Sequence, residues 1–419
     1  MKKLKYIVTC LIGLATSFPV MAQTETQQAE LPTTGLEFTA YLKEVGEKNL
    51  QFLAEKYNVD IAKAEVIASK VMPDPELNFE AEKDNYTIEL GYTLELGKRR
   101  ARINQARVDG ELVNLELESY FKELRAEATV AFLDALLQRD LLELKQNSYR
   151  MMAELHHSDS IRYKLGEITL NDARQSKVEA ITLLNEVYEQ EAALKSANVL
   201  LNRYMGRPIT QATIPVGNMQ NMDNSYTLTD LLPIALEQRV DVQIARKNIQ
   251  SSQSQLKLAK AERRADLGLM VGYERDWHGM WPNRNTIKGG ISVPLKFSNI
   301  NKGEVRARKL AISQSQLSRE SKEMDIQVEV SQAYFEYEAA QKQVKQFKSG
   351  LLAESRAESR SVFEGMVYRY KRGETNIMEV LIAQRTYNEI QEQYIETMKA
   401  YAQAMVNLEY TSGIWEIEF

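Results

Sequence analysis

Four segments of the chain alternate apolar and polar residues, although the sequence around them is typical of helices. Residues 76–82 and 87–96 place apolar side chains at one parity and polar side chains at the other, and residues 267–273 and 287–297 repeat the pattern. Alternation with a period of two predicts strands that have one apolar and one polar face. The segment lengths suit tilted transmembrane strands, which need roughly 9 to 11 residues.

The alternation alone does not distinguish a membrane strand from an amphipathic hairpin of a soluble protein. Four strands are too few to pack as a sandwich, and an open sheet has edge groups that lipid cannot satisfy. One copy of the chain therefore cannot close a barrel, so closure has to come from several copies. We expect oligomerisation to be part of folding.

Long helices are predicted after each pair of strands. Residues 98–163 contain no proline and one glycine, which predicts a helix on the order of 100 Å long. Residues 303–370 are similar, with Leu310, Leu317 and Met324 seven residues apart. The helices that return from each tip carry matching heptad stripes, which predict coiled-coil packing. The stripes are Val380, Tyr387, Tyr394, Tyr401 and Leu408, and, 207 residues earlier, Ala173, Ala180, Val187, Leu194 and Leu201.

A shorter helix is predicted before each pair of strands. Residues 38–70 are rich in Ala, Leu, Glu and Lys and end at a Met-Pro-Asp-Pro segment, which stops a helix. The matching helix of the second half is expected from Pro233 to about Arg264, with residues 60–64 loosely repeated at 241–245.

The turn between the long helix and the returning helix occurs twice. Residues 162–172 reappear 207 residues later at 369–379, and Gly166 and Gly373 can adopt the positive φ that such a turn requires. The chain is therefore predicted to be one duplicated unit. Its expected parts are a signal peptide at 1–22, a first repeat at 23–207, a linker at 208–230 and a second repeat at 231–419.

The N-terminus indicates secretion. Three lysines precede an apolar run from Ile7 to Phe18, and residues 20–22 fit a cleavage site. The run is too short to span a bilayer as a helix. Cleavage would remove the three lysines and no acid, which takes the formal charge from -5 to -8. It would also remove Cys10, the single cysteine, and leave no thiol for a disulfide or a thiolate metal site.

The remaining sequence offers no chemistry to assign. His156, His157 and His278 lack zinc-type spacing, and no phosphate-cradling glycine loop or nucleophile elbow is found. Adjacent helical residues point about 100° apart, so His156 and His157 do not easily serve one ion. We therefore assign no catalytic residue, no metal site and no cofactor. Basic residues are interspersed with acids, so we expect no nucleic-acid partner.

The order of helix, strand, strand, long helix, tip turn and shorter helix, given twice, resembles the TolC-like family of outer-membrane efflux channels over essentially the whole mature chain. The supporting motifs are Ala-Leu-Glu-Gln-Arg-Val-Asp at 235–241, the tips at Gly166 and Gly373, and Leu-Glu-Tyr-Thr-Ser-Gly at 408–413. The resemblance implies a mainly α chain with a transmembrane β-barrel. Three copies would close one twelve-stranded β-barrel in the outer membrane and an α-helical barrel in the periplasm.

The resemblance also implies partners. Besides itself, as a homotrimer, and outer-membrane lipid, the chain would bind a periplasmic adaptor (membrane fusion) protein and an inner-membrane pump, of the resistance-nodulation-division type. Residues 73–77 and 94–103 look like the CzcC-like branch, which serves heavy-metal exporters. The expected function is passive conduction of heavy-metal cations. Some relatives of the copper/silver branch carry an N-terminal lipid. This chain has no lipobox, which separates it from those relatives.

The resemblance implies two sites. In the family, periplasmic adaptors dock at the tip turns, and hydrogen bonds between neighbouring hairpins close the periplasmic end of the channel. The docking residues would be Leu165, Gly166, Glu167, Ile168, Thr169, Arg372, Gly373, Glu374, Thr375, Asn376 and Ile377. The gate residues would be Tyr370 and Asp172, with Tyr163 and Glu379 as their equivalents in the repeat. The chain departs from the family at Ile382, an acidic position in the best-known member, and at Thr375, where an arginine is expected.

If the apolar parity of the strands faces lipid, the polar parity lines the pore. The acidic residues on that side would be Glu76, Glu80, Glu82, Glu89 and Glu95, against Lys288 and Lys296 in the last strand. Threefold repetition would make the lumen acidic and favour cations, although strand faces are often charged for solubility alone. Trp277 and Trp281 suit an aromatic girdle or an extracellular loop.

Alternative functions stay open at the level of sequence. Channels of the same fold also serve drug or bile-salt efflux and type I protein secretion. A periplasmic coiled-coil adaptor or scaffold is an alternative of another class. Adaptors carry one hairpin flanked by compact β-rich domains, whereas this chain has two hairpins and almost no β structure outside the four amphipathic strands.

Overall fold

The computed structural model describes residues 35–219, 225–277, 285–295 and 301–417. The predicted signal peptide at 1–22 lies outside the described residues, as do His278, Trp281 and Lys296. The helices are Phe38–Lys48 (α1), Leu50–Ala68 (α2), Lys98–Lys164 (α3), Leu170–Tyr204 (α4), Leu228–Gln238 (α5), Val240–Ala261 (α6), Lys302–Ser349 (α7), Leu351–Lys371 (α8) and Ile377–Ser412 (α9). The strands are Gly35–Glu37 (β1), Glu76–Ala81 (β2), Asn85–Leu94 (β3), Ile214–Val216 (β4), Leu267–Asp276 (β5) and Asn285–Ser292 (β6).

Two of the predicted continuous helices are interrupted. The helix expected at 38–70 breaks at Asn49, whose side chain accepts a hydrogen bond from the Phe52 N–H and so caps the start of α2. The helix expected at 303–370 breaks at Gly350, which is extended between α7 and α8. Both predictions were wrong because neither a lone asparagine nor a lone glycine marks a break as reliably as proline does.

The helix before the second pair of strands also differs from the prediction. It starts at Leu228, before Pro233, and breaks at Arg239. Helices α1 and α5 both have 11 residues, and α2 and α6 start 190 residues apart, at Leu50 and Val240. Asn49 therefore corresponds to Arg239, and the predicted match of residues 60–64 with 241–245 was wrong.

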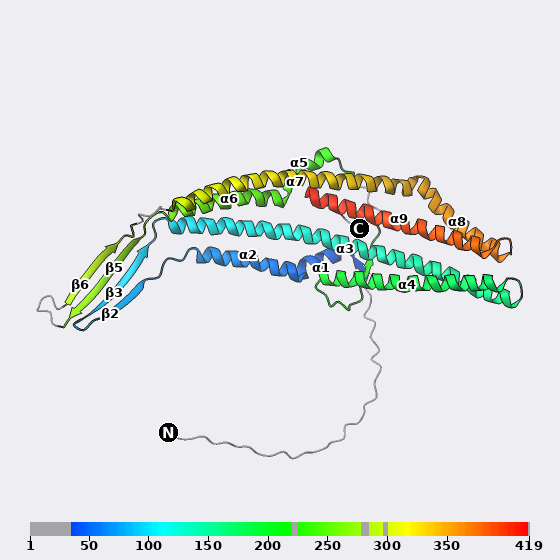
Figure 1. Cartoon of the computed structure of the whole chain (residues 1–419), viewed down its shortest axis with the longest axis horizontal. Helices are drawn as coiled ribbons and strands as arrows, with labels where there is room; N and C mark the ends of the chain where they lie inside the picture. Colours follow the sequence, from blue (N-terminus) through cyan, green and yellow to red (C-terminus); the bar gives the residue numbers. More distant parts are fainter. Residues whose placement is uncertain (1–34, 220–224, 278–284, 296–300, 418–419) are drawn as a thin grey trace, which may run out of the picture. The chain divides into compact units, whose positions relative to one another are not determined.

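Strands β2, β3, β5 and β6 form one antiparallel sheet in that order (Figure 1). The register aligns a polar row of Asn78, Glu89, Gly272 and Lys288, and an apolar row of Phe79, Ile88, Tyr273 and Ile287. Successive residues of a strand point to opposite faces, so each row lies on one face of the sheet. The predicted alternation is confirmed, and the sheet ends at β2 on one side and at β6 on the other.

The helices pack in a connected layer. Helix α3 contacts α2, α4, α6 and α9, helix α6 also contacts α7, and α9 contacts both α7 and α8. Among the helices that precede or follow the strands, the order is therefore α2, α3, α6, α7 (Figure 1). Helices α2 and α7 lie at the two ends of this layer, just as β2 and β6 lie at the two ends of the sheet.

Buried side chains form two apolar clusters, both made by helices and their connections. The larger cluster contains Tyr41, Phe132, Leu201, Tyr337 and Met405, and the smaller one, beside the tips, contains Met152, Leu155, Phe363, Tyr370 and Val380. The predicted heptad stripes contribute to both, since Val380, Tyr401 and Leu408 are buried. Neither cluster contains a residue of the four-stranded sheet.

Candidate functional site

The two tip turns have the same backbone geometry, as the repeat predicts. Gly166 and Gly373 have φ values of 79° and 76°. In each turn the residue after the glycine donates its N–H to a carbonyl five residues earlier, at 2.9 Å. This pattern is the Schellman ending of a helix, which needs a residue in the left-handed conformation. Glycine is the residue that takes this conformation without a steric penalty.

Most of the predicted docking residues are exposed. Leu165, Gly166 and Glu167 of the first tip and Arg372 to Glu374 of the second are open to solvent. Ile377 is different, because its side chain is buried in the smaller apolar cluster. A partner at the tips could therefore contact the turns directly, whereas Ile377 holds the second turn in place.

The acids predicted to act in the gate bind their own turns. Thr169 and Asp172 form a capping box at the start of α4, with each side chain bonded to the other residue's backbone N–H. Glu379 donates its backbone N–H to the Asn376 side chain, and its carboxylate accepts from the Thr375 hydroxyl. Within one chain, the structure does not bring Asp172 or Glu379 into a hydrogen bond with Tyr370.

Tyr370 is instead buried between the two hairpins. The Arg162 guanidinium lies 5.1 Å from the centre of its ring, and Arg162 donates to the Tyr370 carbonyl at 3.3 Å. Burial, followed by the neighbouring Asp159 carboxylate, raises the pKa of Tyr370 well above its ordinary value. Tyr163, its equivalent in the repeat, is exposed. The repeat is therefore asymmetric at this position.

Asp159, near the first tip, was not predicted from the sequence as a site residue. Its side chain is fully buried, and this burial raises its pKa, although Ser176, Tyr370 and Arg162 oppose the increase. The signal was present in the sequence, because Asp159 follows Met152 and Leu155 at the spacing of the buried stripe of α3. An acid at an apolar stripe position indicates a polar contact between helices.

The strand acids lie partly where they were expected. Glu76, Glu80 and Glu89 share the polar face of the sheet. Glu82 follows the end of β2, and Glu95 follows the end of β3, where it pairs with Arg102 at 2.9 Å. Glu274 and Asp276, which were not predicted from the sequence, lie on the same face in β5. Lys288 pairs with Glu274, so the strands themselves carry five acids and one base on this face.

The opposite face of the sheet is apolar and exposed. It presents Leu77, Phe79, Leu90, Val271, Ile287 and Ile291, whose side chains are each more than half exposed. Trp277, beyond the end of β5, lies beside Tyr86 at a ring distance of 5.8 Å. An apolar surface of this extent is typical of a face that contacts lipid or another protein.

The described part of the chain contains neither a membrane-spanning helix nor a cluster of metal ligands. None of its helices has the length and apolar character needed to cross a membrane. The same residues contain no group of three or more His, Cys, Asp and Glu side chains placed to hold a metal ion. His156 and His157 do not belong to such a group.

The duplicated hairpins, the amphipathic sheet and the paired tip turns are the features that the resemblance to outer-membrane efflux channels implies. Residues 231–413 match the family model described as outer membrane efflux protein. The chain is also 23% identical over 418 residues to the cobalt-zinc-cadmium resistance protein CzcC of Cupriavidus metallidurans, an alignment that covers 96% of this chain and 98% of the relative. The resemblance predicted from the sequence is confirmed.

Solved structures show the same fold. A structure of CusC aligns with a TM-score of 0.73 at 14% identity, covering 91% of this chain and 93% of that one. The CmeC outer membrane channel of Campylobacter jejuni aligns with a TM-score of 0.72 at 13% identity, covering 96% and 94%. The outer-membrane channel OprN aligns with a TM-score of 0.69 at 13% identity, covering 96% and 99%.

Proposed function

We propose that this chain is the outer-membrane channel of a tripartite efflux system and that it passively conducts heavy-metal cations to the exterior. The observation that carries the proposal is the four-stranded sheet, which has one apolar exposed face and one acidic face. Among the described residues no further strand pairs with either edge of this sheet. The name of the CzcC relative supports metal cations as the substrate class. An adaptor and an inner-membrane pump would deliver the substrate.

The sheet supports assembly from several copies. A face that buries nothing within the chain becomes stable when it faces lipid, but lipid cannot satisfy the edge groups of β2 and β6. Pairing β6 of one copy with β2 of the next satisfies both edges with the same contact. Three copies of four strands would close a barrel of twelve.

The helix layer has apolar rows at the same two ends. Both rows are exposed within one chain: Leu310, Leu317 and Met324 on α7, and Leu50, Tyr57 and Ile61 on α2. A contact of α7 with α2 of the next copy would bury both rows. In both contacts, the last element of one copy (α7 or β6) would meet the first element of the next copy (α2 or β2), so both contacts arrange the copies in the same order around the ring.

The internal repeat indicates how these two rows would align. Ser252 bonds to Ser315 at 2.8 Å, and at the matching place in the first repeat a Cβ added to Gly110 would lie 3.9 Å from the Cβ of Ala62. Residues of α2 therefore correspond to α6 residues 190 positions later, and those of α3 to α7 residues 205 positions later. Contacts between α3 and α6 then predict contacts between α7 and α2 of the next copy.

The predicted contacts place the two exposed apolar rows against each other. Within the chain, Gln105 contacts Ser251, Glu111 contacts Lys247 and Ser119 contacts Asp241. Their counterparts between copies are Leu310 with Ile61, Gln316 with Tyr57, and Met324 with Gln51. Gln316 adjoins Leu317 and Gln51 adjoins Leu50, so the contact between copies would bury apolar side chains of both rows beside these glutamines. Burial of such residues favours association.

The tips would form the adaptor contact and the periplasmic gate. The exposed turns around Gly166 and Gly373 supply the docking surface, and the 67-residue α3 connects the strands to the first turn. We place Tyr370 and Asp159 at the centre of the gate, with Arg162 between the hairpins. Asp172 and Glu379 support the gate by capping α4 and α9.

Growth of a deletion strain tests the proposed substrate. Strains with and without a complementing copy would be grown on zinc, cobalt, cadmium, copper and silver salts and on a panel of drugs and bile salts. We expect selective sensitivity to metals that the complementing copy reverses. Sensitivity to drugs or bile salts alone would keep the channel and refute the metal substrate. Release of the protein from envelopes by carbonate would instead favour a periplasmic adaptor.

A further inference from the structure

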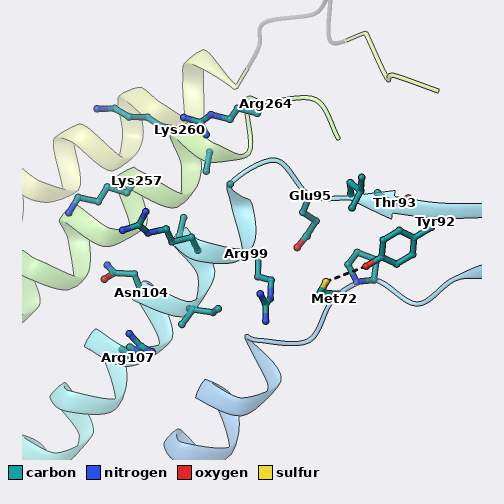
Figure 2. A pocket seen from close by; sticks show the side chains of 17 residues that line it. Met72, Tyr92, Thr93, Glu95, Arg99, Asn104, Arg107, Lys257, Lys260 and Arg264 are labelled. Atoms are coloured by element: carbon teal, nitrogen blue, oxygen red, sulfur yellow. Dashed lines mark hydrogen bonds between the residues drawn. The ribbon is translucent and has the colours of Figure 1, made fainter. Parts of the chain in front are cut away.

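A basic depression lies where the strands meet the helices. It has a volume of about 1010 Å³ and is bounded by the end of β3, the start of α3 and the end of α6 (Figure 2). Its cations come from two separate parts of the chain. They are Arg99, Arg100 and Arg107 of α3, together with Lys257, Lys260 and Arg264 from α6 and the segment after it.

These cations have little anionic compensation. Arg99 donates to the Lys70 carbonyl at 2.7 Å, and the other five make no ion pair within the described residues. The acid that lines the depression, Glu95, is already paired with Arg102 at 2.9 Å. Like charges that line one depression repel one another, so the depression attracts an anion.

The start of α3 adds to the positive potential. Its N-cap residue, Gly97, provides no side-chain hydrogen bond, and the first turn contains no acid. A helix N-terminus favours negative charge, yet Arg99 and Arg100 occupy this turn. A Cβ placed on Gly97 would lie 2.6 Å from Nη1 of Arg264, so a further cation approaches the same helix end. This arrangement is unfavourable unless an anion binds there.

The rim of the depression is apolar. Met72 and Leu94 line it, and Val71 and Leu96 follow or precede lining residues in the sequence. The side chains of all four residues are exposed. Leu94 also ends the apolar row of β3, which continues along the sheet through Leu90. A ligand that fits this surface therefore has a negatively charged head and an apolar body.

We propose that the basic depression binds the phosphate headgroup of a phospholipid, whose acyl chains lie along the apolar face of β3. The inference rests on the proposed insertion of the sheet into lipid, which would place the depression at the boundary between membrane and periplasm. The apolar rim favours a lipid over free phosphate. The bound lipid would neutralise the start of α3 and fix the depth of the sheet in the bilayer.

Calorimetric titration of the full-length trimer in neutral detergent tests the site. The probes are short-chain phosphatidylglycerol, phosphatidylcholine of the same chain length and inorganic phosphate. The variant Arg100→Gln/Lys257→Gln/Lys260→Gln removes three cations of the depression. The control Lys63→Gln/Lys342→Gln/Arg360→Gln removes three exposed cations that lie outside it. Each cation near an anionic lipid strengthens the binding of that lipid severalfold.

We expect phosphatidylglycerol to bind the parent protein at least tenfold more tightly than the triple variant, with the control unchanged. Equal binding by the triple variant would refute the site, and phosphate that competes as well as phosphatidylglycerol would refute a lipid ligand. Loss of the trimer in the triple variant would show instead that the cations join subunits. Single-channel conductance of the same samples tests the proposed channel independently, since its absence in the parent protein would refute the channel and leave the titration unaffected.

Discussion

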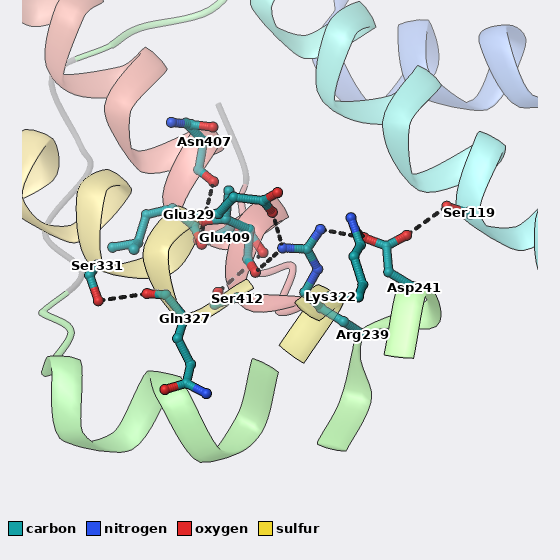
Figure 3. Close-up of polar contacts among 12 residues, drawn as sticks. Ser119, Arg239, Asp241, Lys322, Gln327, Glu329, Ser331, Asn407, Glu409 and Ser412 are labelled. Carbon is teal, nitrogen blue, oxygen red and sulfur yellow. Dashed lines mark hydrogen bonds and ion pairs between the residues drawn. The ribbon is translucent and has the colours of Figure 1, made fainter. Parts of the chain in front are cut away.

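Arg239 at the break between α5 and α6 allows the most quantitative prediction. Its side chain is 8% exposed and reaches three elements (Figure 3). It bonds to Glu329 of α7 at 2.5 Å, to the Thr411 carbonyl of α9 at 3.3 Å and to Asp241 of α6. Burial opposes its charge, but Glu329 and Asp241 outweigh this effect and raise its pKa. Arg239 is therefore a charged link between three helices.

Replacing Arg239 with methionine keeps much of the side-chain volume and removes the charge. Removal of one partner of a fully buried ion pair costs about 3 to 5 kcal/mol. Here the cost is smaller, because Glu329 is 40% exposed and can recover water, and Asp241 keeps Lys322 at 3.6 Å. We expect Arg239→Met to lower the free energy of unfolding by about 2 kcal/mol.

Chemical denaturation in detergent, followed by circular dichroism of the helices, measures this change. Lys247→Met is the matched control, because Lys247 pairs with the exposed Glu111 at 2.7 Å and such a pair contributes at most about 1 kcal/mol. Glu329→Gln and the double variant complete a cycle that isolates the ion pair. A loss for Arg239→Met no larger than that for Lys247→Met would refute this role of Arg239.

Three further predictions concern the tips and the strands. The raised pKa of Asp159 means that the folded chain binds the proton more tightly than the unfolded chain, so this stabilisation is present below pH 3.8 and is lost as pH rises through the raised pKa. The substitution Asp159→Asn should remove this pH dependence of stability and make the protein more stable than the parent at neutral pH. Thermal melts of both proteins at several pH values would measure the difference. Gly373→Ala should lower the free energy of unfolding by about 1 to 2 kcal/mol, because Gly373 has a positive φ. Gly365→Ala within α8 should not lower it, because Gly365 has no positive φ and open space around it. Equal melting temperatures of the two variants would contradict this prediction. Replacing Glu76, Glu80 and Glu89 of the polar sheet face with glutamine should reduce the channel's preference for cations. An unchanged reversal potential in a salt gradient would refute an acidic lumen.

The tip turns and the two faces of the sheet could be predicted because each depends on a few neighbouring residues. The tip turns follow from Gly166 and Gly373, whose neighbours recur in the sequence. The faces of the sheet follow from strict alternation, which the register of β2 with β3 reproduces. Local sequence is sufficient for both features, since the backbone geometry of a turn and the parity of a strand depend on few residues.

Other features depend on contacts between distant residues. The break at Asn49 is stabilised by a bond from its side chain to the Tyr204 carbonyl, 155 residues away. Arg239 lies at the equivalent break, which its contacts with α7 and α9 stabilise. Asparagine and arginine are chemically different, so the two breaks share no sequence signal. The burial of Asp159 requires the second hairpin to cover it. Such partners could not be identified from local patterns, so the breaks and the centre of the gate were missed.

Disulfide crosslinking between copies tests the central claim, which is that α7 of one copy packs against α2 of the next to close a ring. Leu310→Cys/Ile61→Cys would be introduced into the full chain, whose one cysteine, Cys10, lies in the predicted signal peptide. The control pair is Leu310→Cys/Leu50→Cys, because Leu50 lies 11 residues along α2 from Ile61, about 16 Å away. On oxidation we expect a covalent trimer from the first pair and uncrosslinked chains from the control. Uncrosslinked chains from both pairs, in a preparation that migrates as a trimer without oxidation, would contradict the proposed ring.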